Sequence, residues 1–132
     1  MSVTVRRLLS DAYLELGIIR ENEELSPEQL STGIRKLNQM LADWEADGIE
    51  LGYYPQTVAT ANVPITAGAE RAVTFNVAIE IAGSFGAPIP PSTAKVAAES
   101  YRRLERDTIG LVEMSLDHLP GARNGYDILT DE

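Results

Sequence analysis

The stretch SPEQLSTGIRKLNQMLADWEADG, residues 26–48, is the best-determined element of this chain. It opens with a serine, a proline and, three residues after the serine, a glutamine, which is the pattern of a helix N-terminus closed by a capping box. Asp47 and Gly48 end the helix. Between these signals, apolar residues recur every three or four positions, so one helical face lies in a core. That face consists of Leu30, Ile34, Leu37, Leu41 and Trp44.

The segment before this stretch predicts another helix. Thr4 is a suitable N-cap, and Gly17 suits the left-handed position just after the last turn. The apolar spacing again places one set of residues on a single face. This set is Val5, Leu8, Leu9, Ala12, Tyr13 and Leu16.

The residues that follow Gly48 change character. Pro55 and Pro64 interrupt residues 49–68, while threonine and valine favour extended backbone. Because a proline cannot donate to a central β-ladder, we expect an extended arm or irregular hairpin lying on the helical core.

The run from Ala69 to Ala82 is ambiguous. Val73, Phe75 and Val77 begin a strict alternation of β-branched or aromatic residues, which by itself favours a strand. The run also lacks a turn residue and contains four alanines, which are good helix formers. The local pattern leans slightly towards a strand, and the alternative is a helix that is apolar on nearly all sides.

A proline-rich connector precedes the final helix, for which Ser92 is the expected N-cap. The periodicity fades after about Glu113, and the remaining residues resemble a tail that becomes ordered on binding. We therefore expect one domain, with a helical core over residues 1–112 and a tail over residues 113–132. The predicted inner face of the final helix comprises Ala94, Ala97, Ala98, Tyr101, Leu104 and Thr108.

Composition excludes several classes of protein. The chain has 132 residues, a net charge of −9, no cysteine and one histidine. The charge argues against a protein that wraps DNA through many phosphate contacts, and without cysteine there is neither a disulfide framework nor a zinc ribbon. No apolar run is long enough to span a membrane, and the N-terminus is a poor signal peptide. We expect an acidic chain made inside the cell, with no cofactor and no metal.

The acidic residues offer the one enzymatic alternative. Asp43, Glu45 and Asp47 cluster near the end of the second helix, and a pair of carboxylates can hydrolyse glycosides if one lies in an apolar pocket. Nothing in the sequence predicts such a pocket, so we expect a solvated face. His118 lies in the tail, where a catalytic triad has no rigid support.

The run from Leu37 to Tyr53 resembles the signature of the head-to-tail adaptor proteins of tailed phages, especially short-tailed ones. These are also called head-completion or packaged-DNA stabilisation proteins. Their signature is a helix ending in Leu-x-x-Trp-x-x-Asp/Gln-Gly-Ile/Leu, followed by an extended segment with an aromatic residue. The similarity covers roughly residues 3–108, and it includes a third helix, which reverses the strand interpretation of residues 69–82. The motif residues here are Leu37, Leu41, Trp44 and Gly48.

The resemblance implies a mainly α fold: a small bundle of about four helices, with an extended arm between the second and third and an extended C-terminal tail. It also implies a virion protein at the head–tail junction, made in the host cytoplasm. Such proteins form a ring, typically of twelve copies, beneath the portal protein, and the ring docks a downstream tail or nozzle protein. DNA passes through its lumen without specific binding, and no membrane or catalysis is involved.

Two surfaces follow as hypotheses. One is the portal-binding surface, for which the tail is the first choice and the arm the second. The other is the contact between subunits, because a closed ring needs two different complementary patches on each subunit. The alternatives are another helical phage structural or regulatory module and a carboxylate-dependent cell-wall hydrolase. The proposed partner-binding residues are Tyr126, Ile128, Leu129 and His118 in the tail and Tyr53 and Tyr54 in the arm; the proposed subunit-interface residues are Phe75, Ile79, Arg102, Arg103 and Arg106.

Overall fold

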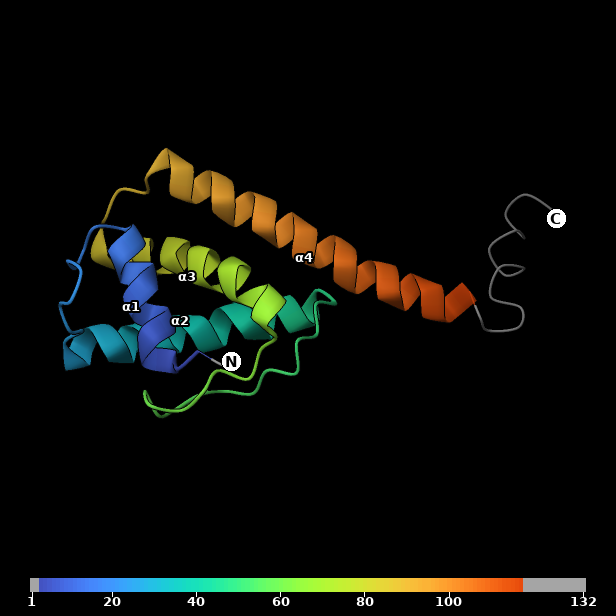
Figure 1. Ribbon diagram of the computed structural model, residues 1–132, viewed down its shortest axis with the longest axis horizontal. Coiled ribbons are helices and arrows are strands. Elements are labelled where there is room, and N and C mark those ends of the chain that lie inside the picture. The colour runs from blue at the N-terminus through green and yellow to red at the C-terminus, as the bar shows by residue number, and fades with distance from the viewer. Residues whose placement is uncertain (1–2, 118–132) are drawn as a thin grey trace.

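The computed structural model describes residues 3–117, with side chains described for residues 3–108. Within that range α3 is the central helix, because α1, α2 and α4 all pack against it, and the arm runs beneath α1 and α2 (Figure 1). No β-strand forms in residues 3–117, so the predicted mainly α bundle of four helices is confirmed. The elements are α1 (Val5–Glu15), α2 (Pro27–Ala46), the 3-10 turn η1 (Ala67–Ala69), α3 (Glu70–Phe85) and α4 (Pro91–Asp117).

The signals that begin and end α1 and α2 act as expected. The hydroxyl of Thr4 accepts a hydrogen bond of 3.1 Å from the Arg7 amide. Ser26 and Gln29 form the complete capping box, with Ser26 Oγ accepting from the Gln29 amide at 3.1 Å and Gln29 Oε1 accepting from the Ser26 amide at 2.9 Å. Gly17 and Gly48 follow the two helices with φ of +74° and +99°. In such left-handed conformations a glycine has no Cβ penalty.

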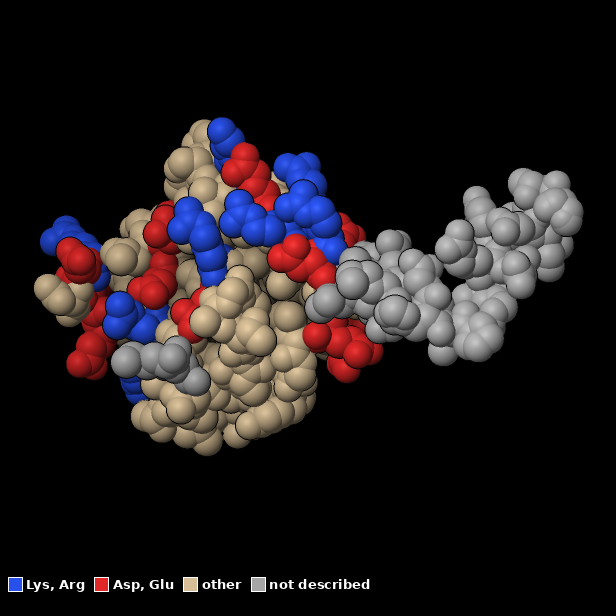
Figure 2. All heavy atoms as spheres, turned by 45° about the vertical axis from the view of Figure 1, so that its right-hand side comes forward, with Lys and Arg blue, Asp and Glu red and all other residues tan. Residues whose placement is uncertain are grey.

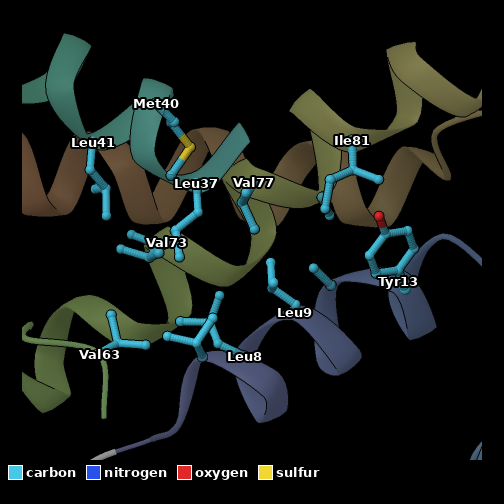
Figure 3. Close-up of a cluster of buried hydrophobic side chains, with 14 of the residues drawn as sticks. Leu8, Leu9, Tyr13, Leu37, Met40, Leu41, Val63, Val73, Val77 and Ile81 are labelled. Carbon is cyan, nitrogen blue, oxygen red and sulfur yellow. The ribbon is translucent and has the colours of Figure 1, made fainter. Parts of the chain in front are cut away.

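The hydrophobic core consists mainly of side chains from α1, α2 and α3 (Figure 3). Gly33 of α2 lets α1 approach closely, because a Cβ at this position would lie 2.9 Å from Leu9 Cδ1. The arm also contributes Val63, which is 1% exposed. The labelled core residues are Leu8, Leu9 and Tyr13 of α1, Leu37, Met40 and Leu41 of α2, Val63, and Val73, Val77 and Ile81 of α3.

Residues 70–85 form α3, so the strand favoured by the local pattern is wrong and the helix implied by the resemblance is right. The reason is tertiary: three helices of the same chain surround α3, and together they bury apolar side chains that point in several directions. Val73, Val77 and Ile81 are all fully buried. This packing outweighs the modest β-preference of branched side chains. Gly86 ends the helix in a left-handed conformation.

The start and the buried face of α4 differ from expectation. The helix begins at Pro91, so Ser92 lies inside the first turn, and the carbonyl of Pro90 accepts the first helical bond from the Ala94 amide at 3.1 Å. Ala94 and Ala98 are exposed, whereas the polar residues Thr93 and Ser100 are buried. Alanine is a poor guide to the buried face because its burial contributes little free energy. The helix continues to residue 117, past the expected core boundary at residue 112.

The expected arm joins α2 to η1 as irregular extended backbone (Figure 1). Its returning half pairs with the start of the chain: the Val5 amide donates to the Ala61 carbonyl at 2.9 Å, and the Val63 amide donates to the Val3 carbonyl at 2.8 Å. Together with buried Ile49 and Val63, these bonds hold the arm on the core.

Candidate functional site

The tryptophan of the sequence motif is a core residue that joins α2 to α4. Trp44 is 7% exposed, and its ring meets Tyr101 of α4 edge-on, with centroids 5.1 Å apart. Leu37 and Leu41 are buried beside it. The motif therefore acts on the fold, and any function attached to it follows by analogy.

The contact between α2 and α4 also brings Asp47, at the end of α2, near Tyr101, and Glu105 lies one turn further along α4. Burial raises the pKa of Tyr101, and the neighbouring carboxylates of Glu105 and Asp47 raise it further. Each carboxylate disfavours a further negative charge nearby, so the phenol holds its proton more tightly. The C-terminal end of α2 thus lies beside the middle of α4.

Asn38 of α2 fastens the arm. Its Nδ2 donates to the Gln56 carbonyl at 3.0 Å, while its Oδ1 accepts from the Gln56 amide at 2.9 Å and from the Tyr53 hydroxyl. The Gln56 side chain, 4% exposed, donates in turn to the Tyr54 carbonyl at 2.7 Å. Asn38 was not among the residues predicted from the sequence. An asparagine inside a helix, where it is intrinsically unfavourable, was the available signal.

The two adjacent tyrosines of the arm have different environments. Tyr53 is half-buried by this network, and burial raises its pKa to about 12, partly offset by a hydrogen bond with the Gln56 backbone. Tyr54 is 62% exposed, and Val58 further along the arm is 53% exposed. Of the two predicted partner-binding residues in the arm, Tyr54 offers the accessible ring.

The arm has an uncharged outer surface. Residues 51–69 contain no Asp, Glu, Lys or Arg, although charged residues make up 23% of the chain. Figure 2 shows the consequence as a continuous area without charged side chains over the lower part of the molecule, with acidic residues at its right-hand edge.

The predicted subunit-interface residues of α3 are partly covered by other residues of the same chain. Phe75 and Ile79 are half-buried, and the Arg71 guanidinium lies over the Phe75 ring, 5.1 Å from its centroid. This cation–π contact adds a charge at the edge of the exposed part of Phe75.

The predicted arginines of α4 form part of a basic outer face. Arg102, Arg103 and Arg106 are exposed, and Lys95 lies two helical turns earlier on the same face. None of the four forms an ion pair with an acidic residue in the described part of the chain. Figure 2 shows Lys and Arg side chains gathered over α4 at the top of the molecule.

A groove of about 400 Å³ lies between α1 and the loop that leads to α2. Arg6, Arg7 and Arg20 line it together with four acidic residues of the loop and of α1, and Arg7 pairs with Asp11 at 3.5 Å. Charges of both signs share the groove, so it does not favour a ligand of either sign.

The acidic residues considered for hydrolysis lie on the surface of the molecule. Asp43, Glu45 and Asp47 are all exposed, as expected of a solvated face. Among the described residues, no three side chains of His, Cys, Asp or Glu gather closely enough to hold a metal ion. No described helix is both long and apolar enough to cross a membrane.

The tail residues proposed for partner binding, Tyr126, Ile128, Leu129 and His118, lie outside the described residues. Compared with known proteins, the sequence matches no family model and no curated protein.

Proposed function

We propose that this chain is a virion structural protein, a head-to-tail adaptor that forms a ring beneath the portal of a tailed phage, extends the DNA channel and docks the tail. The resemblance of residues 37–53 to the adaptor signature carries the proposal. In the structure this stretch forms the junction of α2, the arm and α4, where Trp44 contacts Tyr101 and Asn38 holds Gln56.

The construction of the molecule supports a role as a building block. The arm is tied to the core by side-chain bonds at Asn38 and by backbone bonds to the first residues of the chain. A surface held in this way loses little conformational entropy on assembly. The proposed role needs no catalysis and no cofactor.

Charge supports the passage of DNA without binding. A ring of chains that each carry −9 has a strongly negative field, which repels the DNA backbone. We expect acidic side chains to face the lumen. The purified ring should therefore adsorb little DNA at low salt, and adsorption comparable to that of a basic protein would contradict this arrangement.

The decisive experiment mixes the full chain with rings of the portal protein encoded in the same genome. Light scattering and electron microscopy should show an added ring on one end of the portal. A chain that stays monomeric with portal rings present would favour the alternative of a helical regulatory module. Loss of wall degradation in Asp43→Asn and Asp47→Asn variants of an active chain would favour the hydrolase.

Truncation tests the part assigned to the tail. Deleting the residues after Leu119 should leave the helical core folded, because that core comprises residues before the cut, but should abolish binding to the portal. If a truncated chain still assembles on portal rings, the tail is not the portal contact and the arm, where Tyr54 is exposed, becomes the candidate.

A further inference from the structure

Two opposite sides of the molecule carry complementary surfaces. The first, the arm face, is the exposed surface of residues 51–69. The second, the α4 face, is the outer side of α4 together with the end of α3 and the α3–α4 connection. Figure 1 places the arm at the bottom of the bundle and α4 at the top.

The arm face has the composition of an interface. It lacks charged residues and exposes Tyr54 and Val58, and charge depletion with exposed aromatic residues marks the centre of protein interfaces. Two exposed acids border it: Glu50 precedes it in sequence, and Glu45 shares a shallow pocket with Leu51.

The α4 face has the opposite rim. Its exposed apolar residues are Phe85, the last residue of α3, which is 42% exposed, and Ile89 of the α3–α4 connection, which is 39% exposed. Between Lys95 and Arg106 its charged part contains four exposed cations and two acids, of which Glu99 is exposed and Glu105 is half-buried. These cations have no acidic partner among the described residues, although the chain as a whole is acidic.

The two faces also order their parts alike along the molecule. The Trp44–Tyr101 contact sets the α4 arginines at the same end as Glu45. At the other end, Phe85 meets Tyr13 of α1 at 5.6 Å between ring centroids, and Figure 1 shows the arm's turn at this end as well. A second copy in a similar orientation would therefore bring apolar parts against apolar parts and acids against cations.

We propose that the arm face of one copy docks on the α4 face of the next, with Glu45 and Glu50 opposite Arg102 and Arg106. One chain supplies both halves of the contact, and their charges are opposite, so the partner is a second copy. A contact between two different surfaces is heterologous, and it closes into a ring when the rotation between copies permits. Closure into a ring rests on the proposed function; the pairing of the two faces does not.

Cross-linking tests the contact directly, because the chain has no cysteine and introduced thiols report only on their own positions. Full-length Val58→Cys and Ile89→Cys chains are mixed with a short bis-maleimide cross-linker. The mixture should give several times more cross-linked dimer than either variant alone. It should also exceed a mixture of Val58→Cys with Glu23→Cys, which places the second thiol in the exposed α1–α2 loop.

Charge reversal then tests the pairing of the rims. Arg102→Glu with Arg106→Glu in the Ile89→Cys chain should lower the dimer yield about tenfold, since like charges meet across the contact. Adding Glu45→Arg with Glu50→Arg to the Val58→Cys chain should restore it. Glu21→Arg with Glu23→Arg is the matched control: it changes the net charge equally, and it should not restore the yield.

Two results would overturn the proposal. One is a mixture of the Val58→Cys and Ile89→Cys chains, without charge reversals and with portal rings present, that gives no more cross-linked dimer than either variant alone. The other is failure of the opposite reversal to restore the yield in chains that circular dichroism shows to be folded. A chain that still forms rings on the portal in either case retains the proposed function and loses only this assignment of surfaces.

Discussion

Replacing Asn38 by alanine should release the arm from α2. Asn38 makes three hydrogen bonds to Gln56 and Tyr53, and the substitution leaves the Gln56 amide and carbonyl and the Tyr53 hydroxyl without these partners. Because the side chain is half-buried, water can replace part of what is lost.

The magnitude follows from the three bonds. A typical intramolecular hydrogen bond contributes about 0.5–1.5 kcal/mol net, so their loss sums to roughly 1.5–4.5 kcal/mol before water is considered. We expect Asn38→Ala to lower the free energy of unfolding by about 2 kcal/mol, a substantial part of the stability of a small domain. Tyr53→Phe removes one bond and should cost about 1 kcal/mol.

Urea denaturation measures the loss of stability, and hydrogen exchange of the Gln56 amide measures release of the arm. That amide donates to Asn38 Oδ1 at 2.9 Å, so its protection should fall more than that of core amides. The matched control is Gln39→Ala, an exposed neighbour in the same helix, which should stay within about 0.5 kcal/mol of wild type. An Asn38→Ala chain as stable as this control, with Gln56 still protected, would refute the reasoning.

Three further predictions concern the core, a cap and pH. Trp44→Ala, at a side chain only 7% exposed, should destabilise the chain by about 3–5 kcal/mol in urea denaturation; an effect below about 1 kcal/mol would contradict its role in joining α2 to α4. Ser26→Ala breaks the capping box and should cost about 1 kcal/mol, whereas Ser31→Ala inside the same helix should not. Burial raises the pKa of Tyr13 and of Tyr53 to about 12, so the folded chain holds these phenol protons more tightly than the unfolded chain. The stabilisation that comes from these two phenols should be complete below the ordinary tyrosine pKa of about 10 and should be lost as the pH rises towards 12. The free energy of unfolding of the Tyr53→Phe chain should fall less steeply with pH, and equal slopes would contradict the assignment.

Much of the helical core is predictable because its signals are local. Thr4, Ser26 and Gln29 cap helices through neighbouring amides, and Gly17 and Gly48 follow the helix ends. Each device acts within a few residues, so spacing along the chain is enough to recognise it. The buried face of α1 follows from the same periodicity, and so does most of the buried face of α2.

The interaction surfaces were harder to predict. Tyr53 and Tyr54 are adjacent and chemically identical, yet only contact with Asn38, 15 residues before Tyr53, separates the anchored ring from the exposed one. The α4 arginines are evident from sequence, but their position opposite the arm depends on how the helices pack.

Where α1 and α2 begin and end, and which side of each is apolar, follows from the amino-acid sequence, because caps and helical periodicity are short-range properties of the chain. The local pattern of residues 70–85 favours a strand, and only the resemblance predicted a helix there; in the structure, burial against three helices outweighs the local preference. The tertiary structure alone decided that Asn38 is the anchor of the arm and that the uncharged arm face lies opposite the basic face of α4. These are relations between segments distant in the chain, and only packing brings such segments together.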